Sequence, residues 1–327
     1  MGAGCAGRFL SLVKASAPGK IILFGEHAVV YGRPALAIPV MQVHADVEVL
    51  DSSRTGVWIH APGINLHAEL NTLPSDHPIA FVINKVFASM ESPSPFGRGT
   101  RGEGGLSIKI TSTIPFASGL GSGAAVSVAL IRALSEYLGQ PLSDEQVNTI
   151  AYETEKLYHG TPSGIDNTVI TYAMPVYFVK DQSIEVFKVG APFTIVIGDT
   201  GIAAPTRESV GDVRKLWEAD KEKWEKVFDG IASIVGQARL AVESGHGSSI
   251  GPLMNLNHNL LQKMTVSSPE LDRLVQIALQ AGALGAKMSG GGRGGNMIAL
   301  VQPEDAEKIS AALISAGARR TIITLVQ

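Results

Sequence analysis

The feature that most constrains this chain is a glycine-rich turn that leads straight into an apolar helix. Residues 115–124 read PFASGLGSGA, and residues 124–138 are rich in Ala, Val, Leu and Ile, with Gly139 placed to end the helix. Backbone N–H groups in such a turn can converge on an anion, and the helix N-terminus adds partial positive charge. The segment predicts a phosphate-binding loop; the alternative is a glycine turn with a purely structural role.

The turn matches neither the GxxxxGKS/T sequence of a P-loop nor the GxGxxG sequence of a Rossmann site. The wider chain also lacks the regular strand–helix alternation of a doubly wound sheet, which favours an α+β fold. Apolar periodicity predicts strands at 41–50, 106–110, 194–198, 297–301 and 321–326. It predicts helices at 78–90, 124–138, 208–245, 269–281 and 303–315, and a further helix that starts at Ser143, where Gln146 completes a capping box. The composition of residues 91–105 predicts a loop.

The composition excludes several classes of protein. The chain has 327 residues, 45% of them hydrophobic and 17% charged, which is enough for two medium domains with substantial cores. A net charge of -3 does not suggest a nucleic-acid binder, because a phosphate backbone is usually met by a strongly basic face. The single cysteine, Cys5, cannot form an intrachain disulfide, and no apolar run reaches the roughly 18 residues of a membrane span. We expect a cytoplasmic protein with no membrane partner.

A second segment, APGKIILFGEHAVVYG at 17–32, places Glu26 and His27 directly behind an apolar strand. Side chains in that place are buried or partly buried, and buried polar groups need partners. Lys20, ahead of the strand, is the only cation in the segment. Composition alone favours a solvated position for Lys20, and a buried functional position is the alternative.

Two further segments carry polar groups in unusual places. In EKLYHGTPSGIDNT at 155–168, Glu155 flanks the buried stripe of a helix and Asp166 follows a tight turn. Paired carboxylates from a helix and a loop could bind a divalent metal and accept a proton, whereas the alternative for Asp166 is a turn or capping role. In GAKMSGGGRGGNM at 285–297, a second glycine-rich turn precedes an apolar strand, with a flexible linker as the alternative.

Together these segments resemble the three motifs of the galactokinase, homoserine kinase, mevalonate kinase and phosphomevalonate kinase (GHMP) superfamily. PGKIILFGEHAVVYG, GLGSGAAVSVAL and GAKMSGGGRGGN occur in the expected order. GEHAVVYG and HGTPSGIDN, together with MNLNHNLL at 254–261, are most similar to mevalonate kinases. The resemblance covers residues 14–301.

The resemblance implies a two-domain GHMP kinase fold with the active site in the interdomain cleft. We expect an N-terminal ATP-binding domain at 1–185 and a C-terminal domain at 186–327, whose final strand packs back on the N-terminal domain. The implied reaction is the ATP-dependent phosphorylation of the 5-hydroxyl of mevalonate in isoprenoid biosynthesis. Mg²⁺ is the implied cofactor and a homodimer the implied assembly.

The resemblance also assigns roles to individual residues. Asp166 matches the catalytic base, Lys20 the lysine beside it, and Glu155 a metal ligand. Lys20, Glu26, His27, Asp166 and Thr206 are the expected substrate-binding residues, and Glu155 and Ser122 the expected metal ligands. The expected ATP-binding residues are Pro115, Ala117, Ser118, Gly119, Leu120, Gly121, Ser122, Gly123 and Ala124.

Two positions depart from the family pattern. Gly123 stands where many members have a second serine that helps to hold Mg²⁺, so Ser122 or a water would take its place. Arg293 interrupts the glycine turn of the third motif and either reaches a phosphate or points into solvent. The alternative functions are a sibling kinase acting on phosphomevalonate or another small alcohol, and a non-catalytic nucleotide sensor.

Overall fold

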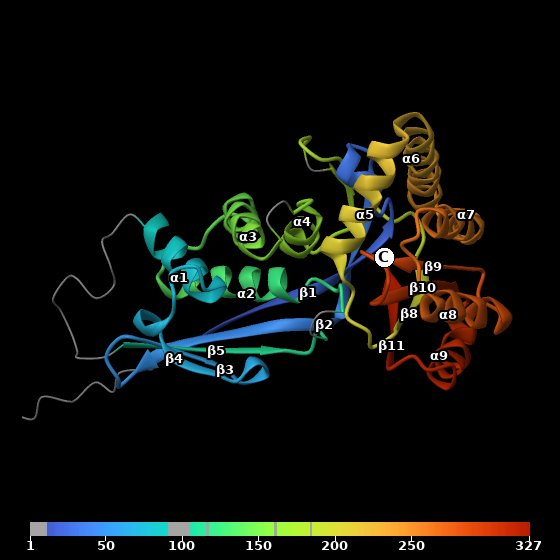
Figure 1. Cartoon of the computed structure of the whole chain (residues 1–327). Helices are drawn as coiled ribbons and strands as arrows, with labels where there is room; N and C mark the ends of the chain where they lie inside the picture. The colour runs from blue at the N-terminus through green and yellow to red at the C-terminus, as the bar shows by residue number, and fades with distance from the viewer. Residues whose placement is uncertain (1–11, 91–104, 116–117, 160–161, 184) are drawn as a thin grey trace, which may run out of the picture. The chain divides into compact units, whose positions relative to one another are not determined.

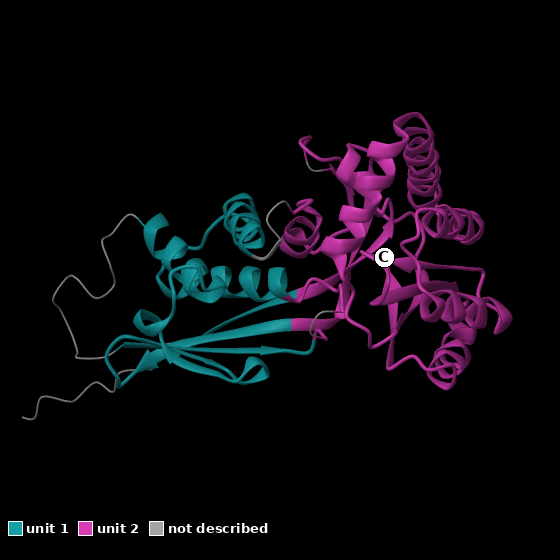
Figure 2. Ribbon diagram, in the orientation of Figure 1, with its two compact units in different colours: residues 1–17, 45–113, 123–160 teal, residues 18–44, 114–122, 161–327 magenta. Residues whose placement is uncertain are grey.

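The computed structural model describes residues 12–90, 105–115, 118–159, 162–183 and 185–327. The chain divides into two compact units, which Figure 2 distinguishes by colour: the first comprises residues 1–17, 45–113 and 123–160, and the second residues 18–44, 114–122 and 161–327. The units are therefore interleaved along the sequence. The consecutive domains 1–185 and 186–327 stay a prediction, and Cys5 and most of the predicted loop at 91–105 lie outside the described residues.

The first unit is a sheet covered on one face by helices (Figure 1). Its strands follow the order β4-β3-β5-β2, with β3 and β5 parallel and the other pairs antiparallel. Ala45, Val47 and Val49 are buried and alternate with partly exposed residues, as the period of a strand requires. The elements are β2 (Ala35–Ser52), β3 (Val57–Ala61), β4 (Leu66–Glu69), β5 (Gly105–Ser112), α1 (Pro78–Ser89), α2 (Ser122–Tyr137) and α3 (Asp144–His159).

The predicted helix boundaries of the first unit are confirmed by their local chemistry. Gly139 has a φ of 75°, a left-handed conformation that glycine adopts readily and that ends α2. Before α3, the Gln146 N–H donates to Ser143 Oγ over 3.3 Å, and the Ser143 N–H donates to Gln146 Oε1 over 2.9 Å. This reciprocal pair is the predicted capping box.

The second unit contains the last part of strand β1, the first part of strand β2 and a separate four-stranded antiparallel sheet. Strand β2 pairs there with β6, and the separate sheet has the order β11-β8-β10-β9. The elements are β1 (Leu12–Phe24), η1 (Ala28–Tyr31), β6 (Val176–Phe178), β7 (Glu185–Val186), β8 (Phe193–Asp199), β9 (Gly285–Ser289), β10 (Asn296–Val301), β11 (Arg320–Val326), α4 (Ile165–Tyr172), α5 (Thr206–Ala219), α6 (Lys221–Glu243), α7 (Ile250–Lys263), α8 (Pro269–Gln280) and α9 (Ala306–Ser315).

One expectation for the second unit was wrong. The single helix expected at 208–245 is two helices, because the Asp220 side chain accepts a hydrogen bond from the Lys223 N–H and starts α6 afresh. The final strand, β11, pairs with β8 along 320–326, so it completes the sheet of the C-terminal part of the chain. Its packing on an N-terminal domain stays a prediction.

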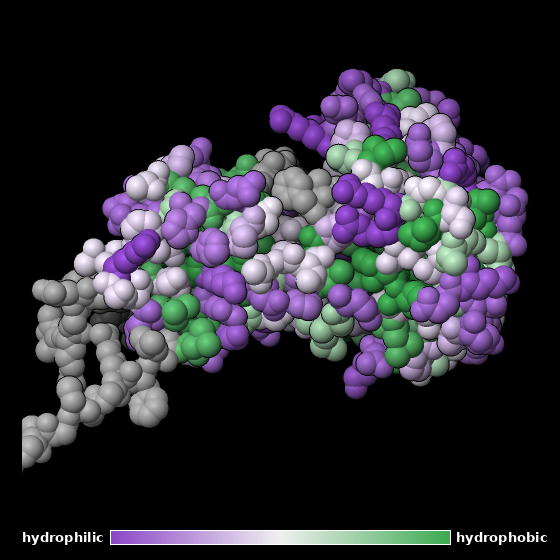
Figure 3. Space-filling view, turned by 90° about the horizontal axis from the view of Figure 1, so that it is seen from below, coloured by the Kyte–Doolittle hydropathy of each residue, from purple (hydrophilic) through white to green (hydrophobic). Residues whose placement is uncertain are grey.

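Apolar side chains on the surface are dispersed. Figure 3 shows polar and apolar residues interspersed on the visible face of the second unit. Within the described part of the chain, no helix combines the length and the apolar character needed to cross a membrane.

Candidate active site

A partly buried ion pair joins two of the predicted catalytic residues. Lys20 lies on β1 with a side chain only 5% exposed, and its Nζ is 2.9 Å from Oδ1 of Asp166 in the first turn of α4. The solvated position that composition favoured for Lys20 is therefore wrong. The predicted closeness of Lys20 and Asp166 is confirmed, and their chemical roles stay predictions.

The glycine turn packs directly against Lys20. The Lys20 N–H donates to the Leu120 carbonyl over 3.0 Å. A Cβ on Gly121, whose φ is 76°, would lie 2.7 Å from Ile170 Cδ1 and 3.1 Å from Lys20 Cγ, so only glycine fits there. At Gly119, with φ of 79°, the nearest described atom is Asn296 Nδ2 at 3.9 Å. Gly119 thus leaves open space on a left-handed turn, as an anion cradle requires.

The base of this turn is tied to its surroundings by polar contacts. Ser118 Oγ donates to the Pro115 carbonyl over 2.8 Å, and Asn296 Nδ2 donates to the Ser118 carbonyl. Leu120 is buried, and Ser122 is the first residue of α2. Ala117 lies outside the described residues. The Asn296 contact links the end of the third motif to the second motif.

His27 occupies a strained turn. Its φ of 60° and ψ of -46°, with the Ala28 N–H donating to the Glu26 carbonyl over 2.6 Å, define a γ-turn of the rare, strained kind. Such backbone strain persists only where the surroundings hold it, and it clusters at functional sites. His27 is buried, and its Nε2 is 3.1 Å from the Gly291 carbonyl.

The protonation state of His27 follows from these contacts. Burial, reinforced by the nearby positive charge of Arg293, lowers the pKa of His27 to about 4 despite the hydrogen bond to Gly291. The ring is therefore neutral at pH 7. Because a carbonyl only accepts, Nε2 carries the proton, and Nδ1 is left as a hydrogen-bond acceptor.

Glu26 forms a second buried ion pair. Its carboxylate contacts Nζ of Lys287 on β9, and both side chains are fully buried. Lys287 Nζ also donates to the Met288 carbonyl over 2.7 Å, while Glu26 Oε2 has no partner within the described residues. Burial raises the pKa of Glu26 and lowers that of Lys287, and the attraction between them opposes both shifts. The predicted contact between Glu26 and substrate stays a prediction.

The third glycine-rich segment is the hairpin loop between β9 and β10. Ser289 pairs with Asn296, so residues 290–295 form a tight connection, and the flexible-linker alternative is excluded. A Cβ on Gly291 would lie 2.4 Å from Oγ1 of Thr206, the first residue of α5. Gly291 thus brings the hairpin into contact with two predicted substrate-binding residues, Thr206 and His27.

Arg293 does not simply point into solvent, and its contact with a phosphate stays a prediction. Its Nη1 is 2.6 Å from Asp212 Oδ2 on α5, and its Nε donates to the Thr265 carbonyl over 3.2 Å. With a φ of 58° it holds the hairpin to α5 and to the end of α7.

The remaining predicted residues, Gly123, Ala124 and Glu155, belong to the first unit. The Gly123 carbonyl accepts a hydrogen bond from Ser127 Oγ over 3.0 Å, Ala124 is buried, and Glu155 on α3 is 4% exposed. No group of three or more His, Cys, Asp or Glu side chains suited to a metal occurs in the described parts of either unit.

Sequence reasoning missed two residues of this site, Lys287 and Asn296. Lys287 lies in a strand whose residues are all buried, and its signal was a lone cation within an apolar run. Its partner Glu26 is 261 positions away, so spacing alone could not pair them.

Comparisons with known proteins agree with this arrangement. Residues 83–174 match the GHMP kinases N terminal domain, and residues 238–319 match the GHMP kinases C terminal domain. The mevalonate kinase of Pyrococcus furiosus is 34% identical over 321 residues, which cover 93% of this chain and 94% of that protein. The chain belongs to the mevalonate kinase family. The mevalonate kinase of Thermococcus sibiricus is 35% identical with the same coverage.

Solved structures of the family agree as well. The L. major mevalonate kinase in complex with R-mevalonate has a TM-score of 0.83 and 30% identity, covering 97% of each chain. Lactococcus lactis galactokinase, at 18% identity and a TM-score of 0.75, shares the fold alone. The predicted family and the two-domain GHMP kinase fold are confirmed.

Proposed function

We propose that this mevalonate kinase family member transfers the γ-phosphoryl group of ATP to the 5-hydroxyl of mevalonate. The observation that carries the proposal is the Lys20–Asp166 ion pair, in which the buried Lys20 packs against the Gly119–Ser122 turn. One lysine thereby touches both the turn that is suited to phosphates and the carboxylate that is suited to the hydroxyl.

Phosphoryl transfer through a loose transition state depends mainly on positioning and on neutralising charge. The N–H groups of the glycine turn would hold phosphate oxygens, and Lys20 Nζ would face the transferred group. Asp166, 31% exposed at its side chain, would accept the hydrogen bond of the attacking hydroxyl and orient it. Neutral His27, with Nδ1 as acceptor, and Thr206 would contact mevalonate.

The residues present fit Mg²⁺ bound together with ATP. Mg²⁺ prefers oxygen ligands and usually takes one or two carboxylates, completed by phosphate and water. The Glu155 carboxylate and the Ser122 hydroxyl are such donors, and the site needs no third carboxylate. When bound, Mg²⁺ neutralises charge on the phosphates. We also propose the remaining family expectations for this chain: domains 1–185 and 186–327 flanking the active site, a homodimer and a cytoplasmic location.

A coupled assay of ADP release tests the proposed function. We expect turnover with mevalonate and little with phosphomevalonate, homoserine or galactose. Preference for phosphomevalonate or another alcohol would establish a sibling kinase instead. ATP binding without ADP release on any of the four substrates would establish a non-catalytic sensor.

A further inference from the structure

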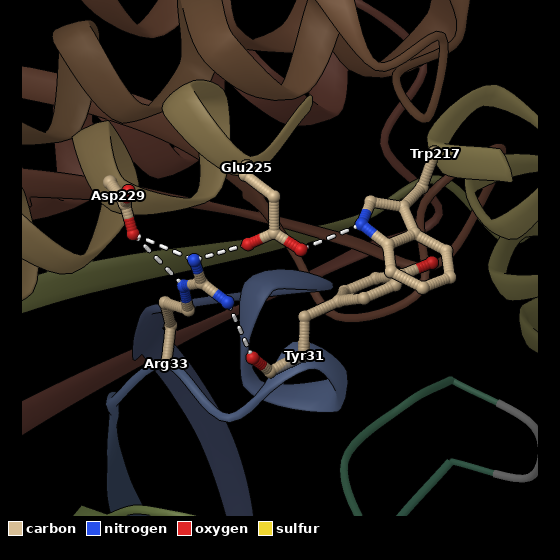
Figure 4. A network of polar contacts seen from close by, with 5 residues as sticks. All are labelled: Tyr31, Arg33, Trp217, Glu225 and Asp229. Atoms are coloured by element: carbon tan, nitrogen blue, oxygen red, sulfur yellow. Dashed lines mark hydrogen bonds and ion pairs between the residues drawn. The ribbon is translucent and has the colours of Figure 1, made fainter. Parts of the chain in front are cut away.

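A polar network fastens the segment after His27 to two helices of the second unit (Figure 4). Arg33 lies between two carboxylates of α6: its Nη2 contacts Glu225 Oε2 and is 2.8 Å from Asp229 Oδ1. Its Nη1 donates to the Tyr31 carbonyl over 2.8 Å. The other oxygen of Glu225 accepts from Trp217 Nε1 on α5 over 2.7 Å. We call these residues the Arg33 junction: Tyr31, Arg33, Trp217, Glu225 and Asp229.

Aromatic rings form a second layer of the Arg33 junction. The Tyr31 ring stacks on Phe228 of α6, with centroids 4.2 Å apart and an interplanar angle of 15°. The Trp217 ring tilts against Tyr31, at 5.5 Å and 48°. Phe228 is fully buried. The last residue of η1 is thus held by stacking as well as by hydrogen bonds.

The Arg33 junction lies at the C-terminal ends of η1 and α5, and the N-terminal ends of the same two helices lie at the candidate site. Helix η1 begins directly after His27, and α5 begins at Thr206. Trp217 lies eleven residues beyond Thr206, about 16 Å along a helix, so the junction lies away from the reacting groups. At the N-terminal ends, His27 and Thr206 both contact Gly291.

Helix η1 also shares a hydrophobic core cluster with the helix that carries Asp166. One core cluster contains Val29 of η1 together with Ile165 and Val169 of α4, and Val30 packs against it. A displacement of η1 would therefore disturb both His27 and the helix that carries Asp166. On the other side of the strained His27 turn, Glu26 is held by Lys287.

We propose that Arg33 is a positioning residue for phosphoryl transfer: by fixing η1 on α6 through Glu225 and Asp229, it holds the strained turn at His27 in the geometry that mevalonate requires. The proposal rests on the proposed function. The Arg33 side chain is 22% exposed, and its partners Glu225 and Asp229 are 36% and 66% exposed. Ion pairs this open to solvent contribute little to the free energy of unfolding. We therefore expect the network to affect the geometry of the His27 turn more than the stability of the fold.

The test compares Arg33→Gln, Glu225→Gln and Arg33→Lys with Arg239→Gln as a matched control. Arg239 lies on α6, as Glu225 does, and is 27% exposed. It pairs with Glu185 at 2.7 Å and Glu243 at 3.1 Å, and these partners belong to neither η1 nor α5. We expect Arg33→Gln and Glu225→Gln to raise KM for mevalonate about tenfold, with KM for ATP changed less than about twofold. The double variant should be no worse than either single one, and Arg33→Lys should be intermediate.

A second readout is independent of turnover. The pKa of His27 in the full chain, followed by NMR with His27→Asn for assignment, should rise from about 4 toward its ordinary 6.5 in Arg33→Gln and stay unchanged in Arg239→Gln. If the wild type lacks mevalonate kinase activity, the proposed function fails while this titration still decides the role of Arg33.

Folded Arg33→Gln and Glu225→Gln variants with wild-type KM for mevalonate and an unchanged His27 titration would overturn the proposal. Failure of all three variants to fold would overturn it equally, because the junction would then be a stability element.

Discussion

At the scale of single residues, the Lys20–Asp166 pair brings a cation and a carboxylate together beside the glycine turn. Both groups come from regular elements, β1 and α4, and Lys20 is almost fully buried. Groups held on rigid elements keep their geometry without help from the ligand. Chemistry that depends on orientation should therefore be sensitive to the Asp166 carboxylate and insensitive to carboxylates elsewhere.

Asp166→Asn should lower kcat roughly 10²–10⁴-fold, with much smaller changes in KM for ATP and mevalonate. The amide keeps the size of the side chain and loses the charge that orients the hydroxyl. Steady-state kinetics with both substrates measures this, with Asp305→Asn on a surface ion pair as control. Near wild-type turnover would remove Asp166 from the mechanism.

His27 makes stability depend on pH. Its folded pKa of about 4 lies below the ordinary 6.5, so the unfolded chain binds the proton first as the pH falls. This contribution is complete above about pH 6.5, and roughly 2–3 kcal/mol of it is lost by pH 4.5. Urea unfolding at pH 7 and about pH 4.5 should therefore show a larger loss for the wild type than for His27→Asn. Equal losses would contradict the buried neutral imidazole.

The sequence indicated the burial of some residues of the candidate site and not of others. Glu26 and His27 behind an apolar strand were expected to be buried, and they are. Lys20 and Lys287 are also buried, because each has a carboxylate partner far away in the sequence. Long-range charge pairing leaves no periodic signal, so no local pattern could reveal it.

At the scale of elements, the 290–295 hairpin contacts two of the predicted substrate-binding residues. Through Gly291 it contacts His27 and Thr206, and through Arg293 it contacts Asp212 of α5. The sequence predicted the strand after the loop, at 297–301, but neither the strand before it, β9, nor that the loop faces α5. That contact depends on tertiary packing between segments about 80 residues apart.

Gly291→Ala should displace the start of α5. The added Cβ would meet Thr206 Oγ1 at 2.4 Å and Thr206 Cβ at 2.9 Å, so we expect a loss of about 1–3 kcal/mol in unfolding free energy and a raised KM for mevalonate. Gly211→Ala on the same helix is the control, since a Cβ there meets no described atom within 4 Å. That control should stabilise the protein by up to about 1 kcal/mol. Equal behaviour of the two variants in urea unfolding would contradict the close contact.

At the scale of the whole molecule, the two units share the long strands β1 and β2 and are interleaved along the chain. Among the described residues, periodicity predicted most of the helices and about half of the strands, because it depends on local burial. It could not predict the interleaving, nor that 208–245 breaks at Asp220, because a capping side chain overrides a continuous helical pattern. The fold class was accessible from the order of elements together with the family motifs.

The proposed metal ligands come from different parts of the chain, and their variants test the metal assignment. Glu155→Gln and Ser122→Ala should each raise the Mg²⁺ concentration for half-maximal activity, about tenfold or more for Glu155→Gln because it removes a charged ligand. Titration of activity with Mg²⁺ at fixed ATP measures this concentration. The control is Glu153→Gln, two residues before Glu155 on α3 and therefore on another face of that helix. An unchanged Mg²⁺ requirement in both variants would contradict the assignment.

The Glu26–Lys287 pair has a consequence for the synthesis of the protein. Its members are separated by 261 positions, and a ribosome adds about 5–20 residues per second, so roughly 13–50 seconds pass before the carboxylate has its partner. We expect stalled nascent chains that end before Lys287 to remain open to protease around residues 17–32, and longer ones to become resistant. The segment at 17–32 therefore leaves the ribosome without the partner of Glu26 and can complete its native contacts only after Lys287 has been synthesised.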